Sequence, residues 1–446
     1  MRWDLDTVAA ATGGIAVGDA VVTGVVADSR RVTPGVLFVA LRGNRVDGHE
    51  FVGAAMSAGA AALLVEPGRL PDDCPGVEVA DPAAALIALG ALRRGELEMP
   101  VVAITGSSGK TTTKDLTAAV LGPGTHASPD SYNNEVGVPL TVLSCPDDAG
   151  ALVLEVGSRG VGHIAALADL VRPDVAVITN IGPAHLEHFG DLATTRRAKW
   201  ELVEALAPGG TAVLPAGDGD LTGRGHPRML TFGEDAGADV VVSAITLDAA
   251  GRAAFTIAHD GQRLAVSLTV AGRHQPRNAA AAVCAALAVG IPLETAVSRL
   301  AGARVSPWRM EVAERTIPGG VVTVVNDAYN ANPASMEAAL ETVAALPGRH
   351  LAVLGMMHEL GPAAPDLHEA VGRLAAELGF VVVVVGDDPG IARGAGESLA
   401  AVVSDPGAAA AAVRSLLHPG DVVLIKASRA TGLERLAESI GGGAAA

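Results

Sequence analysis

The sequence predicts an α/β protein of three domains, with parallel sheets in the second and third domains. Its 446 residues are about three times the length of an ordinary domain, and 49% of them are hydrophobic, which is enough for several buried cores. Short runs of Val, Ile and Leu alternate with alanine-rich helical windows over most of the chain. Strands that alternate with helices form right-handed crossovers, and therefore a parallel sheet covered on both faces.

Changes of pattern divide the chain near residues 97 and 308. Residues 1–97 contain short strand-like runs, and the charged segment 93–100, which contains Gly95 and Pro100, marks the boundary. Residues 98–308 open on a buried strand, and residues 239–270 alternate polar and apolar side chains, which predicts a small antiparallel insertion. Residues 309–446 predict a second parallel sheet. The strands expected in chain order are residues 24–27, 36–41, 61–65, 101–105, 152–156, 175–179, 211–214, 321–325, 351–354, 381–385 and 422–425.

The net charge and the cysteine spacing of the chain exclude several classes of protein. The formal net charge of −17 leaves no basic stripe to neutralise nucleic-acid phosphates, so we expect no nucleic-acid partner. The three cysteines are far apart and form neither a zinc-binding spacing nor a disulfide framework, as is typical of the cytoplasm. The first residues do not resemble a signal peptide, and the longest apolar run, residues 380–385, is too short for a bilayer. We therefore expect a cytoplasmic protein without a membrane span.

A glycine-rich segment after the strand 101–105 predicts a phosphate-binding loop. Glycines let the backbone N–H groups point inward, and the following helix presents its positive end to an anion. In this type of loop the lysine reaches the β- and γ-phosphates and the next hydroxyl holds Mg²⁺. The first glycine lies only three residues before the Gly-Lys pair, so the loop is a shortened variant; a plain surface turn is the alternative. The loop residues are Gly106, Ser107, Ser108, Gly109, Lys110, Thr111 and Thr112.

Two polar side chains follow strands that neighbour this loop in sequence. Glu155 ends the strand 152–156, and His185 lies in the loop after the strand 175–179. Ligands bind beyond the carboxyl ends of the strands in an open parallel sheet, so both side chains are placed to meet a metal ion beside the phosphates. A solvated or helix-capping acid is the alternative for Glu155. Lys199 lies in a helical window at 192–206, where a lysine is ordinarily part of a solvated face.

Two asparagine-rich loops are candidates for substrate recognition. Residues 131–139 contain Asn133 and Asn134, which either bind a substrate or cap a turn. Residues 326–333 follow a buried strand and contain Tyr329, Asn330 and Asn332. So dense a polar cluster predicts a loop that contacts a ligand and then opens a helix.

Together these stretches resemble the Mur ligase family, and the resemblance runs along nearly the whole chain. It includes the shortened phosphate loop, Asp28-Ser29-Arg30, residues 34–43 and Asp47-Gly48-His49. The resemblance implies a small α/β N-terminal domain that binds the UDP part of a nucleotide-sugar (1–97), a central P-loop ATP-binding domain (98–308) and a C-terminal Rossmann-like domain that binds the incoming dipeptide (309–446). The UDP-binding residues implied are Ser29, Arg30, Asn44 and His49.

The resemblance also implies the catalytic apparatus. Thr111, Glu155, His185 and Lys199 would hold two Mg²⁺ ions, with Lys199 carbamylated so that its ammonium becomes a carboxylate-like ligand. Lys110, His185 and Lys199 would be the catalytic residues. The residues implied to bind ATP outside the loop are Asn278, at the adenine, and Arg309 and Asp327, between the second and third domains.

Several stretches resemble the branch of the family that adds D-alanyl-D-alanine to UDP-N-acetylmuramoyl-tripeptide. They are Ser107-Ser108, Lys114-Asp115, residues 133–139, residues 329–333 and Glu359-Leu360-Gly361 with His368. This implies an ATP-dependent, ADP-forming ligase that works through an acyl-phosphate, as a monomer, to make the pentapeptide precursor of peptidoglycan. A MurE-like or folylpolyglutamate-synthase-like amide ligase is the alternative. Asn326, Met356 and Trp308 depart from the pattern of this branch, and none of them is an implied metal or phosphate ligand.

Overall fold

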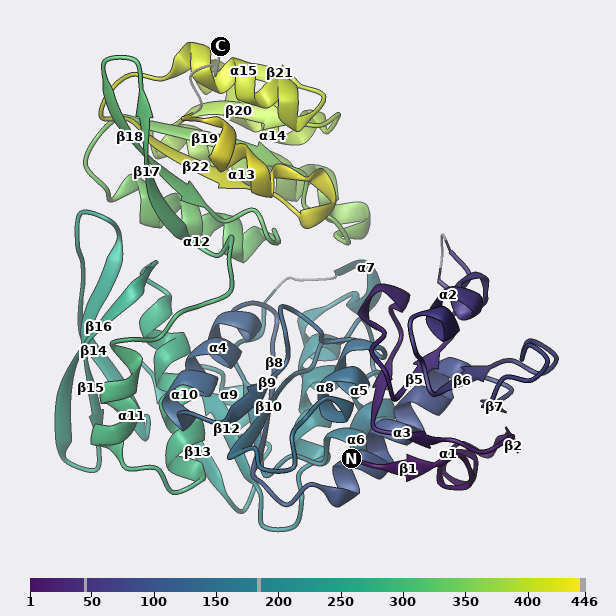
Figure 1. Ribbon diagram of the computed structural model, residues 1–446. Coiled ribbons are helices and arrows are strands. Elements are labelled where there is room, and N and C mark those ends of the chain that lie inside the picture. Colours follow the sequence, from purple (N-terminus) through teal and green to yellow (C-terminus); the bar gives the residue numbers. More distant parts are fainter. Residues whose placement is uncertain (44–45, 183–185, 442–446) are drawn as a thin grey trace.

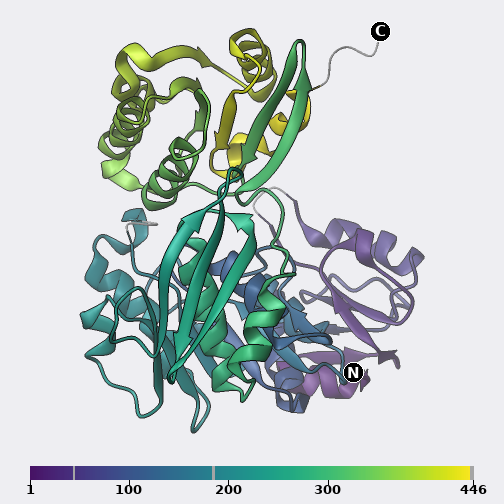
Figure 2. The same cartoon turned by 90° about the vertical axis from the view of Figure 1, so that its left-hand side faces the viewer.

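The computed structural model describes residues 1–43, 46–182 and 186–441 and contains three main β-sheets. Figures 1 and 2 show the C-terminal sheet and its helices stacked on one side of the central sheet, with the N-terminal residues beside the central sheet. The mixed α/β fold with parallel sheets is the predicted one. The domain boundaries at 97 and 308 remain predictions. Among the helices that the structure describes, none has both the length and the apolar character that crossing a bilayer requires.

The first sheet has the strand order β2-β7-β6-β5-β4, and a separate ribbon pairs β1 (Trp3–Asp4) with β3 (Val21–Val22). Its core joins Leu37 and Leu64 of the sheet to Leu86 and Leu89 of the long helix α3. Asp81 caps this helix by accepting hydrogen bonds from Ala83 N and Ala84 N. The strands are β2 (Ile15–Val17), β4 (Gly24–Val26), β5 (Val36–Val39), β6 (Ala62–Val65) and β7 (Gly76–Glu78); the helices are α1 (Leu5–Thr12), α2 (Val52–Ser57) and α3 (Pro82–Glu96).

The second sheet has nine strands in the order β16-β15-β14-β13-β12-β11-β8-β10-β9. Strand β8 is fully buried, and its alternate side chains enter two cores: Val102 and Ile104 pack with α4 and α10, Val101 and Ala103 with α5, α6 and α8. The strands are β8 (Val101–Thr105), β9 (Thr125–Ala127), β10 (Ala151–Glu155), β11 (Val175–Ile178), β12 (Thr211–Pro215), β13 (Met229–Gly233), β14 (Val240–Leu247), β15 (Arg252–His259) and β16 (Gln262–Ala271). The helices are α4 (Lys110–Leu121), α5 (Gly137–Leu143), α6 (Ala168–Val171), α7 (Leu186–Phe189), α8 (Leu192–Glu204), α9 (Gly219–Thr222), α10 (Gln275–Ala288) and α11 (Leu293–Leu300).

The antiparallel segment expected at residues 239–270 is present, and it continues the central sheet. Strand β14 pairs in parallel with β13, Phe232 opposite Val240, and then in antiparallel with β15, which pairs with β16. The sequence analysis did not predict β13, which is partly exposed and follows a glycine-rich segment.

The third sheet has the order β17-β18-β22-β19-β20-β21, with β17 antiparallel and the other strands parallel. Helices α12 and α13 cover one face and α15 and α16 the other. The sequence analysis did not predict β17 and β21, the two edge strands; β17 mixes charged and apolar residues, and β21 is a short Ala-containing run that is only half buried. The strands are β17 (Glu311–Ile317), β18 (Gly320–Asn326), β19 (His350–Gly355), β20 (Val381–Val385), β21 (Leu399–Val403) and β22 (Val422–Lys426); the helices are α12 (Pro333–Ala344), α13 (Ala364–Glu377), α14 (Pro389–Ala395), α15 (Pro406–Leu416) and α16 (Leu436–Ser439).

Candidate active site

The phosphate loop predicted from the sequence lies between the end of β8 and the start of α4. Gly109 is the N-cap of α4 with φ 76°, and no side chain caps the helix, so its first N–H groups are available to an anion. Gly106 has φ 151°, and a Cβ atom there would lie 1.9 Å from Thr179 Oγ1. A Cβ atom at Gly109 would lie 2.6 Å from Asn278 Oδ1. Both glycines are therefore required by their backbone conformation and by close neighbours.

Thr179 and Asn180, the two residues that follow β11, hold the phosphate loop through hydrogen bonds. Asn180 accepts hydrogen bonds from Ser107 N through its carbonyl (3.1 Å) and from Ser108 N through Oδ1 (2.9 Å), and its amide donates to Ser108 Oγ (2.7 Å). Thr179 Oγ1 donates to Ser108 O at 2.6 Å. The sequence analysis did not assign a role to Asn180, and only the adjacency of β8 and β11 in the sheet reveals one.

Lys110, Thr111 and Glu155 meet at the carboxyl ends of β8 and β10. Lys110 Nζ donates to Gly106 O at 2.9 Å, and Thr111 Oγ1 donates to Glu155 Oε2 at 2.7 Å. Burial lowers the pKa of Lys110; Glu155 opposes this shift, and the positive charge of Arg309 adds to it. Arg309 comes from the C-terminal side of the chain and donates through Nη2 to Thr111 Oγ1 at 2.7 Å. The loop is therefore a cationic site that favours an anionic ligand.

Lys199 lies deep in the same region, on helix α8, with its side chain only 2% exposed. Its Nζ donates to Ser158 Oγ at 2.7 Å and lies 5.4 Å from the centre of the Phe189 ring. Burial lowers its pKa well below the ordinary value, and repulsion from Lys110 adds to this shift. Lys199 is thus not a solvated surface lysine, and its buried ammonium loses a proton more readily than that of an exposed lysine. Its partner Ser158 was not singled out in the sequence.

The expected metal ligands are only partly within the structure. His185 lies outside the described residues. Within residues 1–43, 46–182 and 186–441, no group of three His, Cys, Asp or Glu side chains is arranged to hold a metal ion. Thr111 and Glu155 nevertheless place a hydroxyl and a buried carboxylate in contact, and oxygen ligands of this kind are those that Mg²⁺ prefers.

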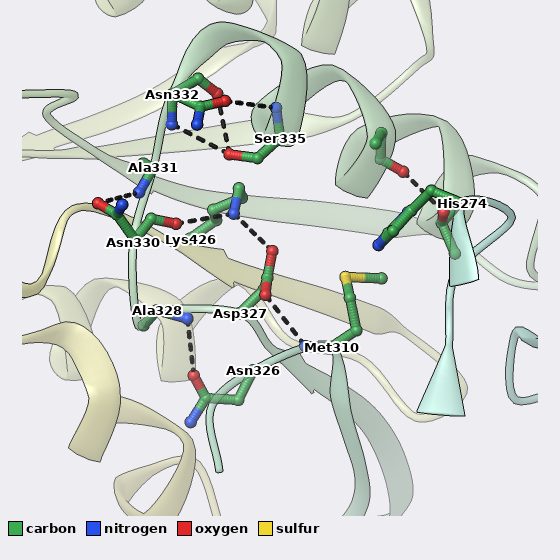
Figure 3. Close-up of polar contacts among 12 residues, drawn as sticks. His274, Met310, Asn326, Asp327, Ala328, Asn330, Ala331, Asn332, Ser335 and Lys426 are labelled. Carbon is green, nitrogen blue, oxygen red and sulfur yellow. Dashed lines mark hydrogen bonds and ion pairs between the residues drawn. The ribbon is translucent and has the colours of Figure 1, made fainter. Parts of the chain in front are cut away.

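Asn278 lies on helix α10 of the central region, and Asp327 lies at the carboxyl edge of the C-terminal sheet; both line the same cavity. Asn278 Nδ2 donates to Gln275 Oε1 at 2.9 Å on helix α10. Asp327 accepts hydrogen bonds from Met310 N (3.0 Å) and from Lys426 Nζ (2.5 Å), as Figure 3 shows. Lys426 also donates to Asn330 O at 2.9 Å. Lys426 is a further residue of this site that the sequence analysis missed, because it ends the apolar strand β22.

His274, at the N-cap of α10, faces this group of residues (Figure 3). Burial lowers the pKa of its imidazole; the charge of Asp327 opposes that shift and the charge of Lys426 adds to it. His274 is therefore neutral at physiological pH. Its Nδ1 is buried and has no hydrogen-bond partner among the described residues.

The expected substrate-binding asparagines have different local roles. Asn133 Nδ2 donates to Glu155 Oε1 at 2.7 Å, which places it beside the contact between Glu155 and Thr111. Asn134 Oδ1 accepts from Gly137 N at 2.8 Å at the start of α5, and Asn332 forms a capping box with Ser335 at the start of α12. The hydroxyl of Tyr329 is hydrogen-bonded to Ser131 Oγ, which links the two asparagine-rich loops.

One cavity of about 690 Å³ contains nearly all of these groups. Its walls come from the phosphate loop, both asparagine-rich loops, α10 and the carboxyl ends of β18 and β22. Ile87 of α3 extends the wall to the N-terminal part of the chain. The predicted residues that line the cavity are Ser107, Ser108, Gly109, Lys110, Thr111, Thr112, Asn133, Asn134, Glu155, Asn278, Arg309, Asp327, Tyr329, Asn330 and Asn332.

The residues expected to bind UDP lie away from this cavity. Asp28 caps the turn Ser29–Arg31 and pairs with Arg30 at 2.7 Å, and that pairing lowers the pKa of Asp28 to about 2. His49 is buried: Nδ1 lies 2.7 Å from Asp47 Oδ1, and Nε2 accepts from Glu66 N at 3.1 Å. Both ring nitrogens of His49 are therefore occupied by the protein. Asn44 lies outside the described residues.

Comparison with known proteins agrees with this geometry. Three family models match consecutive parts of the chain: "Mur ligase family, catalytic domain" (residues 21–94), "Mur ligase middle domain" (104–286) and "Mur ligase, glutamate ligase domain" (308–429). The UDP-N-acetylmuramoyl-tripeptide–D-alanyl-D-alanine ligase of Mycobacterium tuberculosis is 40% identical over 94% of this chain and 92% of its own length; the ligase of that name from Escherichia coli is 34% identical over 95% and 94%.

Solved structures show the same relationship. MurF from Acinetobacter baumannii superposes with a TM-score of 0.88 at 31% identity, over 99% of both chains. MurF ligase from Thermotoga maritima in complex with ADP superposes with a TM-score of 0.83 at 31% identity, over 94% of this chain and 97% of that one. A phosphate loop and a buried strand-end glutamate at one cavity, together with relatives that match along almost the whole chain, lead to one conclusion: this chain belongs to the Mur ligase family.

Proposed function

We propose that this protein is an ATP-dependent ligase that joins D-alanyl-D-alanine to UDP-N-acetylmuramoyl-tripeptide, with release of ADP and phosphate. Relatives of that name cover more than nine tenths of the chain at 34% to 40% identity. The observation in the structure that carries the proposal is the shared cavity, in which the phosphate loop faces residues of all three sheet-bearing regions. The product would be the pentapeptide precursor of peptidoglycan, made in the cytoplasm by a monomeric enzyme.

ATP would lie between the central and C-terminal sheets. The triphosphate would sit on the N–H groups at residues 106–112 and against Lys110 and Arg309, the two cations beside the loop. Asn278 would contact the adenine, and Arg309 and Asp327 would hold the nucleotide from the other side of the cavity. The ADP-bound structure of a relative with 31% identity supports a nucleotide in this fold.

Magnesium would bind at Thr111 and Glu155, and at Lys199 with His185. The hydroxyl of Thr111 and the buried carboxylate of Glu155, which are in contact, fit one such ion. Lys199 fits the second as a carbamate: burial favours the deprotonated amine, which can attack the carbon of CO₂ and lose a proton to give an N-carboxylate anion. The ions would neutralise the phosphate charge that develops during transfer.

The chemistry would proceed in two steps. The terminal carboxylate of the tripeptide attacks the γ-phosphorus of ATP, which gives an acyl-phosphate and ADP. The amine of the dipeptide then attacks the acyl carbon, and the tetrahedral intermediate expels phosphate. Both substrates of the first step are anions, so Lys110 and Arg309 would reduce their repulsion; Lys110 contacts Gly106 O and Arg309 contacts Thr111 Oγ1.

The residues around the cavity would also position the peptide. Asn133 contacts Glu155 and would bind the tripeptide near its reacting carboxylate, while Tyr329 and Asn330 would face the dipeptide. Asn134 and Asn332 would act by fixing their loops. The UDP group would be held outside the main cavity, near Ser29, Arg30, Asn44 and His49.

Mass spectrometry of the products tests this function. The protein is incubated with UDP-N-acetylmuramoyl-tripeptide, ATP and one amine: D-alanyl-D-alanine, diaminopimelate or glutamate. We expect a new amide, one ADP for each amide, with D-alanyl-D-alanine alone. An amide formed with diaminopimelate or glutamate instead would support a different amide ligase, and ATP hydrolysis without any amide would support a nucleotide switch.

A further inference from the structure

Arg429 lies beside Tyr329, the residue whose hydroxyl links the two asparagine-rich loops. Its guanidinium carbon lies 5.1 Å from the centre of the Tyr329 ring and 5.6 Å from that of Trp308, and its Nη1 donates to the Tyr329 hydroxyl at 3.2 Å. Arg429 directly follows Ser428 beyond β22, at the carboxyl edge of the C-terminal sheet, where ligands of such sheets bind. Aromatic contacts hold a guanidinium flat while leaving its N–H edge free to bind an anion.

The backbone under this arginine is strained. Trp308 has φ 60°, a conformation that only glycine adopts without cost, and Met310 has φ 52° on the other side of Arg309. The strain at Trp308 places an indole ring beside Arg429, which a glycine could not do. An unfavourable conformation at a cavity edge indicates a functional constraint on that side chain.

Three cations that line the cavity have partners within the protein. Lys426 pairs with Asp327 at 2.5 Å, and Arg159 lies 3.8 Å from Glu359. Arg309 donates to Thr111 at the phosphate loop. In the part of the chain that the structure describes, no carboxylate pairs with Arg429 or with Arg277, and Arg277 lies on α10 next to the expected adenine residue.

We propose that Arg429 binds the terminal carboxylate of the incoming dipeptide. This inference rests on the proposed function, and it specifies how that function selects an acceptor: the amine must carry a carboxylate about two residues away. Asn133 contacts Glu155, where the proposed reaction takes place. Ser131, two residues earlier, contacts the Tyr329 hydroxyl, and Arg429 donates a hydrogen bond to the same hydroxyl. A fully extended dipeptide spans about 7 Å, so its amine and its carboxylate bind at two separate places. A guanidinium binds a carboxylate with two parallel hydrogen bonds.

Comparison of two acceptors tests this assignment. Wild type, Arg429→Ala, Arg429→Lys and Arg277→Ala are assayed with D-alanyl-D-alanine and with D-alanyl-D-alaninamide, which lacks the carboxylate. We expect wild type to prefer the acid. Arg429→Ala should lower kcat/KM for the acid by about 10- to 100-fold, through KM, and leave the amide and the KM for ATP little changed. Arg429→Lys should restore part of the preference, because it keeps the charge without the bidentate geometry.

Three results would overturn the assignment. Equal losses for the acid and the amide would make Arg429 a structural residue, and loss of the preference in Arg277→Ala alone would move the carboxylate site to α10. Absence of any amide product from wild type with either acceptor would remove the proposed function itself, and this inference with it. Arg429 is exposed, so thermal unfolding of the alanine variant should match that of wild type.

Discussion

Replacement of Lys199 by methionine should remove a pH dependence from the stability of the protein. The Lys199 side chain is 2% exposed and its ammonium has Ser158 Oγ as its hydrogen-bond partner. Burial, followed by repulsion from Lys110, lowers the pKa of Lys199 well below its ordinary value. In the unfolded chain the same lysine remains protonated up to a pH of about 10.4. Between these two pKa values, unfolding therefore takes up one proton at Lys199.

The size and sign of the effect follow from this proton. Because the unfolded state binds the extra proton, the free energy of unfolding rises with pH, by about 1.4 kcal/mol per pH unit for one group. Methionine has a similar volume and does not titrate, so Lys199→Met should lose this contribution. The two proteins should differ in the slope of the unfolding free energy against pH, and this difference reports the proton taken up by Lys199. Lys110 and the other titrating groups are present in both proteins. Arg197→Met, an exposed charge loss on the same helix, is the control and should keep the wild-type slope.

Urea unfolding at pH 7, 8 and 9 in CO₂-free buffer measures these slopes. Trp200 is buried in the central core next to Lys199, so its fluorescence in a Trp3→Phe, Trp308→Phe background follows the unfolding of the central region. We expect the wild-type slope to exceed that of Lys199→Met by about one proton. Identical slopes would mean that Lys199 is charged in the folded protein, and would refute the neutral amine on which carbamylation depends.

Further perturbations address other parts of the site. Lys110→Ala should abolish ligation and leave thermal unfolding unchanged; a ligation assay that finds normal turnover would remove the phosphate loop from the mechanism. Lys199→Ala should be largely inactive and partly rescued by short carboxylic acids, which replace the carbamate as a metal ligand; full activity without an added acid would contradict that role. Lys426→Met should destabilise the protein by about 3 kcal/mol, because it leaves the carboxylate of Asp327, only 15% exposed, without its cation. In an Asp327→Asn background the same change should cost much less, and an equal cost measured by denaturant unfolding would show that the pair is not coupled.

Local patterns were enough to predict the phosphate loop and the position of Glu155. The phosphate loop consists of a buried strand, two glycines and a lysine at the start of a helix, and all of these are close in sequence. Glu155 was predictable because residues that follow parallel strands lie at the same edge of the sheet. The buried state of Lys199 could not be predicted in this way, because the helix carrying it reads as a solvated segment with Arg196 and Arg197. Only its packing against Ser158 and Phe189 shows that the amine is enclosed.

Residues that act through contacts distant in sequence were not predictable. Asn180 supports the phosphate loop from a neighbouring strand, and Lys426 meets Asp327 across 99 residues of chain. Composition also could not separate two roles of asparagine: Asn133 contacts Glu155, whereas Asn332 caps a helix. In the N-terminal sheet, resemblance assigned His49 to the nucleotide-sugar, and the structure shows that its ring is held by Asp47 and Glu66. The sequence shows which residue type stands at a position, but the contacts of its side chain depend on the fold.

A crystal structure with a non-hydrolysable ATP analogue and Mg²⁺ tests the central claim most directly. That claim is that positive charge at one edge of the central sheet lets a carboxylate approach a triphosphate. We expect the terminal phosphate to contact Lys110 and the N–H groups of residues 106–111, with a divalent ion between Thr111 and Glu155. A terminal phosphate bound away from that loop, or no divalent ion beside Glu155, would contradict it.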